Sequence, residues 1–158
     1  MKEEYKKLPL RSGVGIILLN KENKVFVAKR IDNPKNFWQM PQGGIDKGED
    51  FYAAALRELK EETSITSIKL IKEIEGNFTY ILPDNLIGII WKGKFRGQKQ
   101  KWFIMRFTGD KSEINIKTKH PEFLDWKWVN IENLTDQVVK FKLQVYKKIK
   151  EEIKKVIN

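Results

Sequence analysis

The chain has 158 residues, 41% of them hydrophobic, which is enough for one folded domain with a buried core. Its 31 lysines and arginines against 21 aspartates and glutamates give a formal net charge of +10, which attracts nucleic acids and nucleotides, although a solvated lysine-rich surface gives the same count. The absence of cysteine excludes disulfides and thiolate sites, and the single His120 excludes a histidine-cluster metal site, so any metal ion is held by oxygen ligands.

The first half of the chain predicts strands followed by one helix. Strands are predicted at residues 14–19, 25–29 and 37–40, and a helix at residues 50–62. The polar residues 20–23 predict a hairpin turn, and Gln42-Gly43-Gly44 predict a sharp turn after Pro41. The apolar run at 14–19 is too short to span a membrane and no cleavage site follows it, so we expect a cytoplasmic protein with no membrane association.

The second half predicts further strands and a terminal helix. Strands are predicted at residues 68–74, 78–82, 102–107 and 126–129, and an amphipathic helix at residues 138–156. Residues 86–95 are apolar but interrupted by glycines, so a strand and a packed loop both remain open. The polar, basic residues 97–101 predict a connection. One mid-chain helix and one terminal helix among these strands indicate a single α/β domain with a mixed sheet over residues 1–158.

The predicted helix at 50–62 carries an unusual concentration of acid. Glu61 and Glu62 follow Glu58 by three and four residues, so the three carboxylates lie on roughly one side of the helix. Two carboxylates about 6 Å apart repel by roughly 2–3 kcal/mol at an effective dielectric of about 20, so a nearby cation is expected. Mg²⁺ and Mn²⁺ take carboxylate and carbonyl oxygens and bridge them to phosphate. The alternative for such a cluster is a solvated acidic face.

The stretch from Gly43 to Ile65 resembles the Nudix box, the signature of the Nudix hydrolase family. The matching positions are Gly43, Glu49, Arg57, Glu58, Leu59, Glu61, Glu62 and Ile65. Ser64 stands where the signature has glycine; a serine in that left-handed position costs about 1 kcal/mol or requires another cap. The resemblance implies an α/β/α sandwich with a mixed β-sheet that hydrolyses a nucleoside diphosphate linked to another group.

The resemblance also implies roles for the acidic residues. The implied ligands of two or more Mg²⁺ or Mn²⁺ ions are Glu58, Glu61, Glu62 and the carbonyl of Gly43. Glu61 is expected to share in ligation or in activating water. Arg57 is expected to support catalysis by orienting Glu49 or the helix glutamates. Metal ions neutralise phosphate charge and activate water, and a carboxylate then needs only to take the proton.

Stretches outside the box resemble one Nudix subgroup, whose members remove pyrophosphate from the 5′ end of RNA or split diadenosine tetra- and pentaphosphates. These stretches are residues 37–44, 97–103, 121–123, 126–129 and 137–142. The resemblance implies Glu122 as a further metal ligand; a surface glutamate is the alternative. The implied phosphate and base contacts are Arg11, Arg30, Gln42, Tyr80, Lys99, Lys101, Val139, Phe141 and Lys142. The alternatives are solvated charges, a strand aromatic at Tyr80 and the apolar helix stripe at Phe141.

We therefore expect an RNA 5′ pyrophosphohydrolase that leaves a 5′-monophosphate and so starts RNA decay. A hydrolase acting mainly on dinucleoside polyphosphates is the alternative, because one base pocket and a row of phosphate contacts serve both substrates. A catalytically silent RNA-binding module is a third possibility, against which the intact Glu58, Glu61 and Glu62 argue. The expected partner is 5′-phosphorylated RNA or a dinucleoside polyphosphate, and the oligomeric state stays open.

Overall fold

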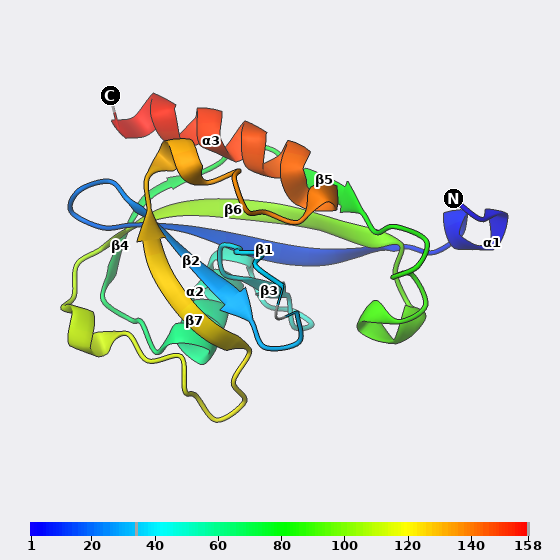
Figure 1. The fold of residues 1–158 in the computed structure, drawn as a ribbon, viewed down its shortest axis with the longest axis horizontal. Coiled ribbons are helices and arrows are strands. Elements are labelled where there is room, and N and C mark those ends of the chain that lie inside the picture. The colour runs from blue at the N-terminus through cyan, green and yellow to red at the C-terminus, as the bar shows by residue number, and fades with distance from the viewer. Residues whose placement is uncertain (34, 158) are drawn as a thin grey trace.

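In the computed structural model, which describes residues 1–33 and 35–157, the strands form one mixed sheet between two helical layers (Figure 1). The strands are β1 (Leu10–Leu19), β2 (Val25–Arg30), β3 (Gln42–Gly44), β4 (Ile68–Glu73), β5 (Phe78–Ile81), β6 (Gly97–Phe107) and β7 (Phe123–Val129). The α-helices are α1 (Glu3–Lys6), α2 (Phe51–Thr63) and α3 (Leu143–Ile157). The predicted α/β/α sandwich with a mixed sheet is confirmed.

The parallel pair β1 and β6 forms the centre of the sheet. It runs in unbroken register from Leu10 beside Gly97 to Leu19 beside Arg106. The strand order of the described residues is β4-β6-β1-β2-β7, with β3 paired to β1, β5 paired to β6, and antiparallel pairing everywhere except between β1 and β6. β7 therefore lies at one end of that order, with only β2 as its neighbour.

A helix covers each face of the sheet (Figure 1). α3 packs its buried Tyr146 and Ile149 over one face, against Trp102 of β6. α2 packs Ala54, Ala55 and Leu59 over the other face, among the buried residues Ile16, Phe26 and Phe103. Because both faces are covered, β1 is buried without interruption from Gly13 to Leu19. No helix within residues 1–33 and 35–157 is long and apolar enough to cross a membrane.

Two predictions around the glycines are wrong. Residues 37–40 are not a strand, because their backbone donors go elsewhere: Trp38 N donates to Gln137 O at 2.8 Å and Met40 N to the Tyr146 hydroxyl at 2.8 Å, and Gln39 alone bridges to Ala28. Gln42–Gly44 is not a sharp turn but strand β3, antiparallel to β1. Tertiary pairing with β1 sets its conformation.

Other boundaries in the second half also differ from prediction, among them the start of β7 at Phe123 instead of residue 126. Residues 97–101 are the first half of β6, because Gln98 and Gln100 find buried hydrogen-bond partners instead of solvent. The terminal helix begins at Leu143, after a 3₁₀ turn at Lys140–Lys142. The open segment 86–95 is a packed loop with a 3₁₀ turn at Ile90–Gly93.

α2 has well-defined ends. Asp50 caps its start by accepting a hydrogen bond from Ala53 N at 2.7 Å. Ser64 ends it in the left-handed conformation, with φ of 67°, that the signature glycine would adopt. The Ser64 hydroxyl donates to Asn115 O at 2.9 Å, a contact that glycine lacks and that offsets part of the strain.

Candidate active site

The three helix glutamates lie at different depths. Glu62 is 2% exposed, and its Oε2 is a buried oxygen without a hydrogen-bond partner. Glu58 is partly buried, whereas the Glu61 side chain is 59% exposed. α2 therefore presents a gradient from a buried carboxylate to a solvated one, rather than a uniform acidic surface.

Arg57 fixes the carboxylates around it. Its Nε and Nη2 donate to the two oxygens of Glu49 at 2.8 and 2.9 Å, and Nη2 also donates to Gly44 O at 2.9 Å. Nη1 donates to Glu58 at 2.8 Å and to Glu61 at 3.2 Å. This pairing holds the pKa of the Glu49 carboxyl down to about 2. One guanidinium thus joins α2 to β3 and orients two of the predicted metal ligands.

The glycines of β3 let α2 approach the sheet. A Cβ on Gly43 would lie 2.0 Å from the carboxyl carbon of Glu58, and one on Gly44 would lie 2.4 Å from Nη2 of Arg11. The Gly43 carbonyl oxygen lies beside Gly13 of β1, 2.8 Å from where a Cβ on Gly13 would stand. Any side chain at these positions would displace a charged group of the site. The ligand role of the Gly43 carbonyl stays a prediction.

Glu122 joins this group from the segment just before β7. Its backbone carbonyl accepts a hydrogen bond from Ile31 N at 2.9 Å, which ties it to the end of β2. Burial, then the carboxylates of Glu122 and Glu58, raise the pKa of Glu62 well above its usual value. Burial is also the main cause that raises the pKa of Glu58, although Arg57 opposes it. The carboxylates of Glu58, Glu62 and Glu122 therefore lie near enough to one another to raise the pKa of Glu62 and Glu58.

These residues fit a divalent cation. Within residues 1–33 and 35–157, no group of three or more acidic or histidine side chains forms an ion cage by itself. Mg²⁺ is commonly held by only one or two carboxylates together with substrate phosphates and water. The buried Oε2 of Glu62 has no hydrogen-bond partner in the protein, so it is available as a metal ligand.

Two arginines face the carboxylates. Arg11 donates to Gln98 Oε1 at 2.8 Å, and its guanidinium lies 5.2 Å from the ring centroid of Trp91. Burial lowers its pKa, while Tyr80, Glu58 and Glu122 act in the opposite direction. Arg30 forms a two-point ion pair with Asp32 at 2.7 and 2.8 Å, and this pairing raises its pKa. Arg11 shares a hollow with Glu58, and the contact of both arginines with phosphate stays a prediction.

A buried aromatic and lysine cluster adjoins Arg30. The Tyr80 and Phe141 rings lie 5.6 Å apart, and the Lys142 Nζ lies 5.4 Å from the centre of the Tyr80 ring. Burial, with a contribution from Arg30, lowers the pKa of Lys142 to about 7. Its Nζ donates to Gln39 Oε1 at 3.4 Å. The predicted base-binding residues Tyr80, Phe141 and Lys142 are therefore brought together.

The other predicted contacts are more dispersed. Val139 lines a small hollow with Arg30 and Trp38, next to the aromatic cluster. Gln42 accepts from Gln100 Nε2 at 3.0 Å. Lys99 is exposed on β6, and Lys101 directs its Nζ to Gly76 O at 3.3 Å, toward the turn between β4 and β5. Their contact with phosphate stays a prediction.

Sequence reasoning missed the residues that hold these side chains. Gln98 links Arg11 to the Tyr80 hydroxyl, Trp91 stacks on Arg11, and Gln39 holds Lys142. Both glutamines are almost fully buried. Residues 98–101 alternate between glutamine and lysine and are polar on both faces of β6, so no apolar alternation marked this half of the strand in the sequence.

The acidic helix α2, joined by Arg57 to the glycine strand β3 in an α/β/α sandwich, agrees with a hydrolase of phosphoanhydride bonds, the class to which the family and the named relatives assign the chain. The chain belongs to the NUDIX family, whose domain model matches residues 9–149. Hydrolases of this family generally use divalent metal ions. The predicted membership in this family is confirmed.

Named relatives and solved structures agree with this membership. The RNA pyrophosphohydrolase of Pelagibacter ubique is 67% identical over 158 residues, covering 100% of both chains. That of Roseobacter denitrificans is 50% identical over 91% of each chain. The structure of the E. coli dihydroneopterin triphosphate pyrophosphohydrolase superposes with a TM-score of 0.72 at 21% identity, covering 92% of this chain and 99% of that one. The C. elegans Ap4A hydrolase gives 0.63 at 19% identity, covering 90% and 98%. These two structures share the fold.

Proposed function

We propose that this protein is an RNA pyrophosphohydrolase that cleaves 5′-triphosphorylated RNA with water, giving 5′-monophosphorylated RNA and pyrophosphate. The observation that carries the proposal is the 67% identity, along the whole of both chains, to a relative with that name. The carboxylates around Glu62 and the arginines opposite them supply the chemistry that such a reaction needs. An RNA substrate also agrees with the net charge of +10, and we propose a cytoplasmic location for the protein.

In this proposal Glu58, Glu62 and Glu122 hold two or more Mg²⁺ or Mn²⁺ ions, with the Gly43 carbonyl as a further ligand. Bound divalent ions neutralise phosphate charge and make a bound water more acidic. Glu61, the most exposed helix glutamate of the site, takes part in ligation or receives the proton of the attacking water.

Arginines and the aromatic cluster select and orient the substrate. Arg11 and Arg30 bind phosphate oxygens through forked guanidinium donors, and Lys99 and Lys101 add point charges at longer range. Tyr80 and Phe141 accept a base near the 5′ end, and the Lys142 Nζ supplies a donor within that pocket. Holding the phosphates in line with the attacking water lowers the barrier by positioning as well as by charge.

A dinucleoside polyphosphate hydrolase is the second candidate. The observation that favours it is that one base pocket beside two arginines accepts an adenosine and a phosphate row equally well. The carboxylate site is the same for both reactions. The two substrates differ in the number of phosphates, in the second nucleoside of the dinucleotide and in the 3′-linked chain of the RNA.

A competition experiment separates the two candidates. Purified protein is given triphosphorylated RNA and diadenosine pentaphosphate together with Mg²⁺, and kcat/KM is measured for each. We expect a preference for the RNA; a strong preference for the dinucleotide would overturn the proposal. Glu62→Gln serves as the inactive control, because it keeps the shape of the buried side chain and removes its charge. Turnover by that variant would contradict the role of Glu62.

A further inference from the structure

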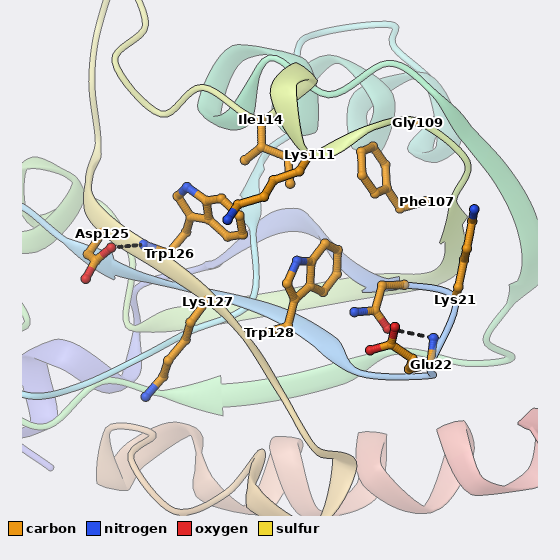
Figure 2. Close-up of a pocket in the computed structure, with 11 residues that line it drawn as sticks. Lys21, Glu22, Phe107, Gly109, Lys111, Ile114, Asp125, Trp126, Lys127 and Trp128 are labelled. Carbon is orange, nitrogen blue, oxygen red and sulfur yellow. Dashed lines mark hydrogen bonds between the residues drawn. The ribbon is translucent and has the colours of Figure 1, made fainter.

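A cleft of about 680 Å³ lies away from the carboxylates, beside the exposed edge strand β7 (Figure 2). Three aromatic side chains line it, Phe107, Trp126 and Trp128, together with Ile114. All four pack into the core layer on the α2 face of the sheet, the face that also carries the acidic helix. The volume matches that of sites for small organic ligands, such as a nucleotide.

The walls of the cleft are fixed to the catalytic elements. One wall is the segment around Ile114, whose neighbour Glu113 accepts hydrogen bonds from Thr66 N and Ser67 N at 2.8 Å each. Asn115 N donates to Thr63 O at 2.9 Å, and Ser64 bonds back to Asn115. This wall is therefore attached to the C-terminal end of α2. The opposite wall is β7, which begins directly after Glu122.

The aromatic side chains of the cleft are held rigidly. Trp126 stacks on Phe26, with ring centroids 5.6 Å apart and an interplanar angle of 16°. Trp128 stacks on Phe107 at 6.0 Å, and the two tryptophans meet edge to face at 6.3 Å. Pre-ordered indoles lose little entropy when a flat ring stacks on them, and base stacking accepts any base sequence.

Charged side chains surround the aromatic residues of the cleft. Lys21 and Lys111 line it, together with the carboxylates of Glu22 and Asp125. Lys127 borders the cleft too, but its Nζ lies over Trp38 on the other face of the sheet. Figure 2 shows Lys111 on the Trp126 side of the cleft and Lys21 at the far margin, so these two cations flank the aromatic floor. Lys21 and Lys111 are exposed. Aromatic rings flanked by lysines are the combination that binds single-stranded nucleic acid.

A basic and aromatic surface connects the predicted base pocket to this cleft. Val139 and Arg30 share a hollow with Trp38. Trp38 lies beneath two lysine ammonium groups, with Lys127 Nζ 4.1 Å and Lys29 Nζ 5.4 Å from its ring centroid. Among the described residues, no further β-strand pairs with the free edge of β7. A single-stranded RNA can therefore pass around this edge of the sheet to the tryptophans.

From these observations we propose that the cleft between β7 and the 107–114 segment binds a nucleotide of single-stranded RNA, downstream of the 5′ end held at the carboxylates. The base stacks on the Trp126 indole with Trp128 at its edge, and Lys21 and Lys111 contact the flanking phosphates. This inference rests on the proposed function for its substrate. It predicts that an RNA long enough to round β7 is a better substrate than a short one with the same 5′ end.

The test compares a triphosphorylated dinucleotide with a triphosphorylated RNA of about 12 nucleotides, within the usual range of single-strand site sizes. The variant is Lys21→Glu with Lys111→Glu, and the matched control is Lys147→Glu with Lys148→Glu on the exposed face of α3. For the long RNA, we expect the cleft variant to bind more weakly. The slope of its log kcat/KM against log salt concentration should be smaller by about 1.4, because two phosphate contacts are lost. Its turnover of the dinucleotide, and both activities of the control, stay at the wild-type level.

A second readout keeps the inference separate from the proposed function. Binding of a fluorescent 5′-hydroxyl RNA of the same length is measured by anisotropy, so no phosphoanhydride is involved. Trp126→Leu weakens this binding roughly fivefold to a hundredfold if a base stacks there. If the wild type cleaves no triphosphorylated RNA, the proposed function fails while this binding still reports on the cleft. Equal binding by wild type, the lysine variant and Trp126→Leu would overturn the inference and leave the cleft to a protein partner.

Discussion

Gly43→Ala tests whether the close approach of β3 to α2 positions a catalytic carboxylate. The added Cβ would lie 2.0 Å from the Glu58 carboxyl carbon, about 1.4 Å short of the 3.4 Å at which ordinary contact begins. The obstructing group is the end of a side chain, so the chain still folds, at a cost of roughly 1–3 kcal/mol for overpacking. The Glu58 carboxylate, however, must move by an ångström or more and stretch its 2.8 Å bond to Arg57.

A displacement of that size is expected to lower kcat/KM for triphosphorylated RNA about 100-fold. Gly76→Ala is the control, because its left-handed φ of 81° imposes strain while no atom lies within 4 Å of the added carbon. The assay pairs thermal unfolding with kcat/KM at several Mg²⁺ concentrations. We expect both variants to lose stability but only Gly43→Ala to lose activity. Full activity in Gly43→Ala would refute the placement of Glu58 in the site.

Three further substitutions probe other contacts. Arg57→Lys replaces the forked guanidinium that holds Glu49, Gly44 and Glu58 with one point charge. We expect activity, measured over a Mg²⁺ titration, to fall about 10–100-fold. Full activity would contradict the role of Arg57 in orienting the carboxylates. Lys142 has a pKa of about 7 when folded against 10.5 as its ordinary value, so the unfolded chain binds more protons between these values. The free energy of unfolding of the wild type minus that of Lys142→Met should therefore rise between pH 7 and pH 9.5, as measured by urea unfolding. The same difference at both pH values would contradict the prediction. Ser64→Ala keeps the strain and loses the hydroxyl bond, so we expect it to unfold about 1 kcal/mol more easily than the wild type, while Ser64→Gly stays near the wild-type value.

The acidic helix was predictable because its information is local. The spacing of Glu58, Glu61 and Glu62 and the apolar residues between them define a helix without reference to other parts of the chain. Even Ser64, the one departure from the family signature, ends the helix in the expected conformation. The different burial of the three glutamates was not predictable, because it depends on how Arg57 and β3 pack against that helix.

The strands with polar or glycine residues were not predictable from local pattern. β3 consists of Gln42, Gly43 and Gly44, which carry no alternation of apolar side chains and become a strand only by pairing with β1. Gln98 was predicted to lie in a polar connection, yet it is fully buried. Its hydrogen-bond partner Arg11 lies 87 positions earlier in the chain, too far for a local pattern to show. Polar residues near an active site are satisfied by distant partners, and such pairs leave no periodic signal.

The central parallel pair also has a consequence for how the protein folds during synthesis. β1 emerges early, but Arg11 meets Gln98 only after 87 further positions have been made. At 5–20 residues per second this delay is roughly 4–17 s, during which one side of a strongly apolar strand has no partner. The pairing is also of high contact order, which slows folding. β1 is therefore a segment of the nascent chain that stays open to chaperones and to aggregation, and Arg11 meets Gln98 only when the sheet closes.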